Sequence, residues 1–130
     1  MDTVIDNDVT IAVADRAMGL DNTQDILDLM VFMRYNHNAS GIVLFKESLP
    51  ESFFELRTGL AGEILQKFSN YSFKVAIVGD FSQYKSKSLK DFIYECNEGN
   101  LVFFKSDLAS AIKALTGNSR KPEKAKTLQA

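Results

Sequence analysis

The stretch that decides the fold is Lys74-Val75-Ala76-Ile77-Val78-Gly79-Asp80, in which a run of apolar residues stops at a turn signal. A short apolar run without alternation is typical of a strand that is covered on both faces, and such strands belong to parallel sheets. Gly41-Ile42-Val43-Leu44-Phe45 repeats the pattern earlier in the chain, and Leu101-Val102-Phe103-Phe104 repeats it later. These runs predict three strands inside one sheet.

Segments with helical periodicity lie around these strands, because apolar residues recur there every three or four positions. The four sets are Ile26, Leu29, Met30 and Met33; Phe53, Leu56, Leu60, Ile64 and Phe68; Leu89, Phe92, Ile93 and Cys96; and Leu108, Ala111, Ile112 and Leu115. A side-chain oxygen that accepts from the free amides of a first turn caps a helix. We therefore expect caps at Asn22 or Thr23, at Ser86 or Ser88, and at Asp107.

The second of these helices is expected to begin near Pro50, since Pro in a first turn costs no backbone hydrogen bond. Gly59 and Gly62 lie inside its pattern, and each costs about 1 kcal/mol relative to Ala in a helix. They predict a kink or a close approach of the helix to the sheet. Gly117 is expected to end the last helix in the left-handed conformation.

The first segment predicts a β-hairpin. Residues 3–5 and 9–14 are β-prone, and Asp6-Asn7-Asp8 between them tolerates a tight turn. The expected order is then β-β-α-β-α-β-α-β-α, which indicates a single α/β domain over residues 1–117 with a mostly parallel sheet flanked by helices. Residues 118–130 form a basic polar tail that we expect to be disordered, because almost nothing apolar is left to bury.

The composition excludes several classes of protein and of functional site. The chain has 130 residues, 45% of them apolar, with one Cys and one His, so it has no internal disulfide and no multi-histidine metal site. Its formal net charge of −2 argues against steering toward nucleic acid. No apolar run approaches the ~20 residues that span a bilayer, and the acidic start is unlike a signal peptide. We expect a cytoplasmic protein with no cofactor and no metal.

The loop Gly79–Ser88 is the first candidate site, because ligands gather beyond the carboxyl ends of parallel strands. Helix amides flanked by lysines can hold a phosphate or carboxylate. The candidate ligand-binding residues are Arg57, Asp80, Ser82, Lys85, Lys87 and Ser88, and Asp80 is a general base only if it is buried. In the plainer interpretation a serine caps the helix and the lysines face solvent. No catalytic residue is assigned.

Three residues outside this loop or on its helix are further candidates for a functional role. Thr58, between Arg57 and Gly59, is a candidate for phosphorylation, although such a triplet is more often a helix irregularity with an exposed arginine. His37 is expected to act at a helix end rather than in catalysis. Cys96 falls on an apolar helix face and is expected to be an inert packing residue.

Three blocks of sequence carry a resemblance. Residues 58–68 (TGLAGEILQKF), 75–82 (VAIVGDFS) and 86–97 (SKSLKDFIYECN) resemble the bacterial family known as domain of unknown function number 4180. The likeness covers about residues 3 to 116 and implies a fold class without naming a chemistry.

More loosely, the order of elements is similar to the STAS domain and its sporulation anti-sigma-factor-antagonist relatives. In that superfamily a Ser or Thr followed by Gly-Leu, at the start of the second helix, accepts phosphate and controls a partner. The resemblance implies this role for Thr58, which precedes Gly59-Leu60. Two features depart from the pattern: Leu56-Arg57 replaces the usual Asp-Ser, and a helix that begins near Pro50 would place Thr58 in mid-helix.

Two functions follow as hypotheses. The first is a non-enzymatic, STAS-like regulatory or protein-interaction module, whose partner is another protein or a second copy in a homodimer. The alternative is a binding protein or enzyme for an anionic small molecule that uses the Gly79–Ser88 loop. We expect no membrane and no specific nucleic acid as partner, since four charges on a tail give only salt-sensitive attachment. The alternative requires Arg57, Asp80, Ser82 and Ser88 to meet in one pocket.

Overall fold

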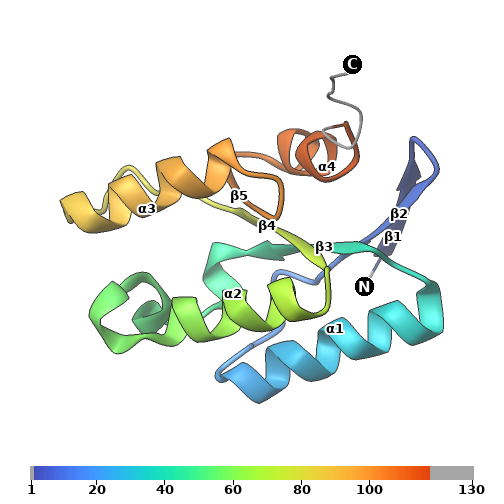
Figure 1. The fold of residues 1–130 in the computed structure, drawn as a ribbon, viewed down its shortest axis with the longest axis horizontal. Coiled ribbons are helices and arrows are strands. Elements are labelled where there is room, and N and C mark those ends of the chain that lie inside the picture. Colours follow the sequence, from blue (N-terminus) through green and yellow to red (C-terminus); the bar gives the residue numbers. More distant parts are fainter. Residues whose placement is uncertain (1, 118–130) are drawn as a thin grey trace.

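The computed structural model describes residues 2–117, which form one α/β domain (Figure 1). The elements are β1 (Asp2–Asp6), β2 (Val9–Val13), α1 (Thr23–His37), β3 (Gly41–Phe45), α2 (Leu60–Asn70), β4 (Lys74–Val78), α3 (Lys87–Glu98), β5 (Val102–Lys105) and α4 (Leu108–Gly117). The predicted order of strands and helices is confirmed. The disorder expected for the tail concerns residues 118–130, which lie outside the described part.

One five-stranded sheet has the order β1-β2-β3-β4-β5, with β1 antiparallel to β2 and the other neighbours parallel. Asp6 pairs with Val9, so the hairpin loop is only Asn7-Asp8. Both loop residues have positive φ, 53° and 63°. This is the geometry that a two-residue hairpin turn requires, and Asn and Asp tolerate it better than other residues with a side chain.

The two faces of the sheet are covered differently. Ile42, Leu44 and Ile77 pack with residues of α1, α2 and α3, whereas Val43 and Ala76 pack under α4. The strands β2 to β5 follow one another in sheet order, so right-handed crossovers place α1, α2 and α3 on the same face. Figure 1 shows α1 and α2 below the sheet and α4 above it. Only α4 crosses to the second face.

Three expected helix caps are confirmed. The amide of Asp25 donates to Asn22 Oδ1 at 2.9 Å, and the amide of Leu89 donates to Ser86 Oγ at 3.2 Å. The amide of Ser110 donates to Asp107 Oδ1 at 2.7 Å. The prediction for Gly117 was wrong, because this residue lies inside α4 and does not have a positive φ.

The prediction that the second helix begins near Pro50 was also wrong. Two short 3-10 turns, Glu51–Phe54 and Leu56–Thr58, precede α2, which begins at Leu60. Gly59 has φ +77°, and this left-handed conformation cannot continue a helix. The 3-10 turns still bury Phe53, so its helical spacing was a signal of burial rather than of one continuous helix.

Of the kink or close approach expected at Gly59 and Gly62, the structure has a break at Gly59 and no close approach at either glycine. Gly59 breaks the helix, but neither it nor Gly62 approaches the sheet, because a Cβ at either position would meet no atom within 4 Å. The close approach lies instead at Gly79, after β4. A Cβ there would stand 2.5 Å from Lys46 Cβ and 2.9 Å from Lys46 Cδ, so the Lys46 side chain crosses over this glycine.

Within residues 2–117, none of the helices is both long enough and apolar enough to cross a bilayer.

We predict that Gly79→Ala lowers the free energy of unfolding by about 1–3 kcal/mol, because the new methyl group overlaps Lys46. Gly62→Ala is the matched control. It adds the same group in a helix where nothing lies within 4 Å, and should raise stability by about 0.5–1 kcal/mol. Urea denaturation monitored by circular dichroism measures both. Equal effects of the two substitutions would contradict the close contact at Gly79.

Candidate functional site

A hollow of about 540 Å³, here called the α3 groove, opens between the 3-10 turns that follow β3 and the residues that lead into α3. Its lining residues are Glu51, Phe54, Glu55, Leu56, Arg57, Tyr84, Lys85, Ser86, Ser88 and Leu89. Both walls follow the carboxyl ends of neighbouring parallel strands, β3 and β4. The groove thus lies at the end of the sheet where ligands of α/β folds bind.

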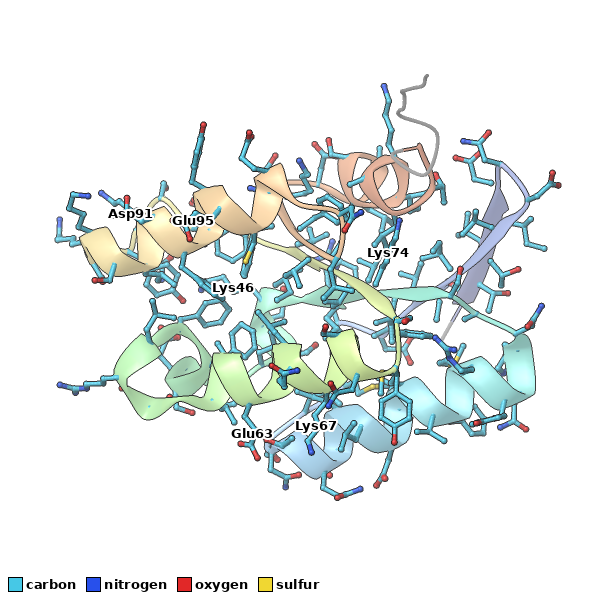
Figure 2. The ribbon with its side chains drawn as sticks, viewed as in Figure 1. Lys46, Glu63, Lys67, Lys74, Asp91 and Glu95 are labelled. Carbon is cyan, nitrogen blue, oxygen red and sulfur yellow. The ribbon has the colours of Figure 1, made fainter. Side chains whose placement is uncertain are left out.

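Aromatic rings form an apolar part of this groove. The rings of Phe54 and Tyr84 stack with centroids 5.3 Å apart and an interplanar angle of 19°. Lys46 Nζ lies 5.7 Å from the Phe54 centroid and 5.2 Å from the Tyr84 centroid, close enough for cation–π attraction. Figure 2 shows Lys46 between the ribbons of α2 and α3.

The Tyr84 hydroxyl is buried and has no hydrogen-bond partner within residues 2–117. Burial raises the pKa of Tyr84, and the carboxylate of Glu51, which lies close without reaching hydrogen-bonding geometry, raises it further. The phenol therefore stays protonated throughout the neutral range. An unpaired buried hydroxyl is costly, so it marks a place where a bound group would gain a hydrogen bond.

Charges of both signs stand around the groove. Arg57 Nη2 lies 4.0 Å from Glu55 Oε1, and the arginine side chain is 88% exposed. Glu51 and Lys85 add one more charge of each sign to the lining. Because the charges balance, the groove has no net preference for an anion, and it suits a polar surface that carries charges of both signs.

The six predicted ligand residues do not meet in one hollow. Arg57, Lys85 and Ser88 line the α3 groove together, whereas the anion hypothesis required Arg57, Asp80, Ser82 and Ser88 to meet. Lys87 lies outside it, with Nζ paired to Asp91 Oδ2 at 2.8 Å one turn along α3. Asp80 lines a different hollow.

Asp80 and Ser82 form a local pair instead. The Ser82 hydroxyl donates to Asp80 Oδ1 at 2.6 Å, and the Ser82 amide donates to the same oxygen at 2.9 Å. These bonds lower the pKa of Asp80, first through the hydroxyl and then through the amide, and the charge of Lys46 adds to the effect. Asp80 is exposed, so the burial that a general base would need is missing.

Thr58 is exposed and directly precedes the Gly59 break before α2. The expected mid-helix position was therefore wrong. Its Oγ1 lies 2.8 Å from the carbonyl oxygens of both Ser52 and Glu55, and it accepts from the amide of Leu60 at 3.2 Å. The hydroxyl thus fastens the 3-10 turns to the start of α2.

His37 and Cys96 fit their plainer interpretations. His37 is the last residue of α1, and its ring centroid lies 5.7 Å from that of Phe32. Burial raises the pKa of Cys96 to about 11, with the charge of Glu95 as a smaller cause, so the thiol is protonated at neutral pH. Within residues 2–117, no group of three or more His, Cys, Asp and Glu side chains is arranged to hold a metal ion.

Several groove residues were absent from the predicted set, notably Glu51, Phe54 and Tyr84. The aromatic stack joins positions 30 residues apart, and no local pattern shows such a pairing. Tyr84 stood inside the candidate loop, so its large ring in a polar segment was the one available signal.

Comparison with known proteins gives one match. The profile of a family described as Domain of unknown function (DUF4180) matches residues 6–115. Neither the curated proteins nor the solved structures contain a match.

We predict that Ser82→Ala raises the pKa of Asp80 toward the ordinary value of about 3.9, because the hydroxyl bond is its largest stabilising contact. The retained amide bond keeps the pKa below that value. Since the folded-state pKa is lowered, the pair stabilises the fold at neutral pH and loses this effect as pH falls through the lowered pKa. Carboxyl ¹³C NMR titration measures the shift. Ser88→Ala is the control, and an unchanged Asp80 pKa in Ser82→Ala would contradict the assignment.

Proposed function

The chain belongs to the DUF4180 family, and on that premise we propose that it is a cytoplasmic, non-enzymatic protein-interaction module. The partner binds at the α3 groove, and modification of Thr58 controls the binding. The observation that carries this proposal is the mixed character of the groove, in which two acidic and two basic side chains surround an aromatic stack. Protein surfaces combine apolar anchors with charges of both signs, whereas a small anion gains little from a balanced lining.

The position of Thr58 supports its role as the control point. It adjoins Arg57, which lines the groove, and it stands exposed at the N-terminal end of α2. A phosphate there would carry nearly two negative charges next to a helix N-terminus and an arginine. It would also remove the hydroxyl proton that Thr58 donates to the Ser52 or Glu55 carbonyl. The 3-10 turns that form one wall of the groove would then rearrange.

The order of elements supports a STAS-like regulatory role, in which a hydroxyl before the second helix is phosphorylated. The alternative, an anionic small molecule, is reduced to Arg57, Lys85 and Ser88 at this groove, because Asp80, which that hypothesis also required there, lines a different hollow. Homodimerisation is the special case in which the partner is a second copy of the chain.

A photo-crosslinking experiment tests the proposal. A photoreactive amino acid replaces Lys85 in the groove or, as control, Tyr35, which is 78% exposed on α1. The full chain is expressed in the cells of its origin, and adducts are identified by mass spectrometry. We expect one dominant protein adduct from position 85 and none of the same mass from position 35. A co-purified small anion without a protein adduct would support the alternative.

We predict that Thr58→Glu lowers the yield of the position-85 adduct at least tenfold, because the added charge and the lost hydroxyl contacts reshape the groove wall. Gln24→Glu adds the same charge to the first turn of α1 and should leave the yield unchanged. Thr58→Ala removes the hydroxyl without adding a charge, so it shows which of the two changes lowers the adduct yield. Equal yields in Thr58→Glu and Gln24→Glu would overturn the control role of Thr58.

A further inference from the structure

The chain leaves β4 and β5 toward opposite faces of the sheet. After β4 it enters α3, whose Leu89 packs on the face that α1 and α2 also cover. After β5 it enters α4, whose Ala111 and Leu115 pack on the other face. Within residues 2–117, β4 and β5 are the one pair of parallel neighbours whose following helices pack on opposite faces of the sheet. Diverging connections open a crevice at the carboxyl ends of the strands, and open α/β sheets bind their ligands at such places.

The structure has a hollow at this place, here called the β4–β5 crevice. A part of about 410 Å³ is lined by Gly79, Asp80, Phe81, Phe104, Lys105, Ser106 and Ser110. A smaller part of about 280 Å³ shares Lys105 and Ser110 and adds Lys113 and Ala114. None of these residues lines the α3 groove. The larger part falls in the range of about 300–1,000 Å³ that is typical of small-molecule sites.

One end of the crevice is cationic. Lys105, Ser110 and Lys113 all line the smaller part. Within residues 2–117, neither lysine side chain has an ion pair or a hydrogen bond to another residue. The Lys105 ammonium has only the Phe103 ring, 6.0 Å from its centroid. The helix N-terminus supplies little here, because Asp107 already accepts from the Ser110 amide. Two unpaired ammonium groups beside a hydroxyl suit a phosphate.

The other end has the opposite chemistry. Asp80 is held ionised by the two hydrogen bonds from Ser82, and a carboxylate accepts hydrogen bonds from several donors. Between the two ends, Phe81 and Phe104 meet edge to face with centroids 5.3 Å apart and give the crevice an apolar wall. A ligand that matches both ends has an anionic group at one end and hydroxyl donors at the other.

We propose that the β4–β5 crevice binds a phosphorylated polyhydroxy compound, with its phosphate between Lys105 and Lys113 and its hydroxyls donating to Asp80. The Ser110 hydroxyl donates to the phosphate, and the carbon skeleton lies against Phe81 and Phe104. This site is independent of the partner surface at the α3 groove. Inorganic phosphate alone fits less well, because it brings no sugar hydroxyls to donate to Asp80.

Titration of the ¹⁵N-labelled full chain tests this proposal with three probes: ribose 5-phosphate, inorganic phosphate and ribose. We expect saturable amide shifts with ribose 5-phosphate, confined to residues 79–82 and 104–113, and at least tenfold weaker binding of the other two probes. Lys105→Gln and Lys113→Gln each weaken the binding of ribose 5-phosphate about tenfold, because each removes one charge-assisted contact. Lys90→Gln, exposed on α3 and outside both hollows, is the control.

Asp80→Asn tests the hydroxyl-binding end of the site without changing the phosphate-binding end. It should weaken ribose 5-phosphate several-fold and leave inorganic phosphate unchanged or bound more tightly. Equal affinity for ribose 5-phosphate and phosphate would overturn the polyhydroxy assignment. Absence of saturable shifts in the crevice, or shifts that Lys90→Gln changes as much as Lys105→Gln does, would overturn the site. Neither result bears on crosslinking at position 85, so the two proposals fail separately.

Discussion

Burial of β3 and β4 on both faces is the constraint on which the rest of the structure depends. Val43 and Ala76 are fully buried on one face, and Ile42 and Ile77 are 1% exposed on the other. Right-handed crossovers between strands taken in order supply helices to one face only. The second face must therefore be covered by a helix that crosses over, and α4 does so. Because α4 crosses over, the connections after β4 and β5 leave toward opposite faces of the sheet, and the β4–β5 crevice opens between them.

The edges of the sheet are protected in two ways. On β5, the Asn97 side chain accepts from the Phe104 amide at 2.8 Å and donates to the Phe104 carbonyl at 3.3 Å, so it takes the place of a neighbouring strand. On β1, exposed Asp2 and Asp6 give the free edge negative charge, which opposes pairing with an identical edge. Both features oppose the addition of a further strand at the edges of the sheet.

Local sequence patterns predicted the helices and strands well. They failed where the spacing of buried residues fitted both a helix and a 3-10 turn. Residues 41–45 and 74–78 are strands as expected, because a short continuous apolar run between turn signals is typical of a buried strand. Asn22, Ser86 and Asp107 cap as expected, since capping is a contact within one turn. The failure came at Phe53, whose burial in a 3-10 turn has the same spacing as burial in a helix. The break between the 3-10 turns and α2 lies at Gly59, and its left-handed φ is seen only in the backbone of the folded structure.

The sequence by itself determined the α/β class, the order of elements and most helix caps, because these depend on contacts between near neighbours. Only the tertiary structure decided which side chains share a hollow. It places Arg57 and Lys85, which lie in two different connections, at the α3 groove, and it stacks Phe54 on Tyr84. Asp80 lines the β4–β5 crevice instead. The groupings at the α3 groove depend on the path of the loops over the strand ends, and the β4–β5 crevice depends on the crossing of α4. Both follow from packing the whole domain.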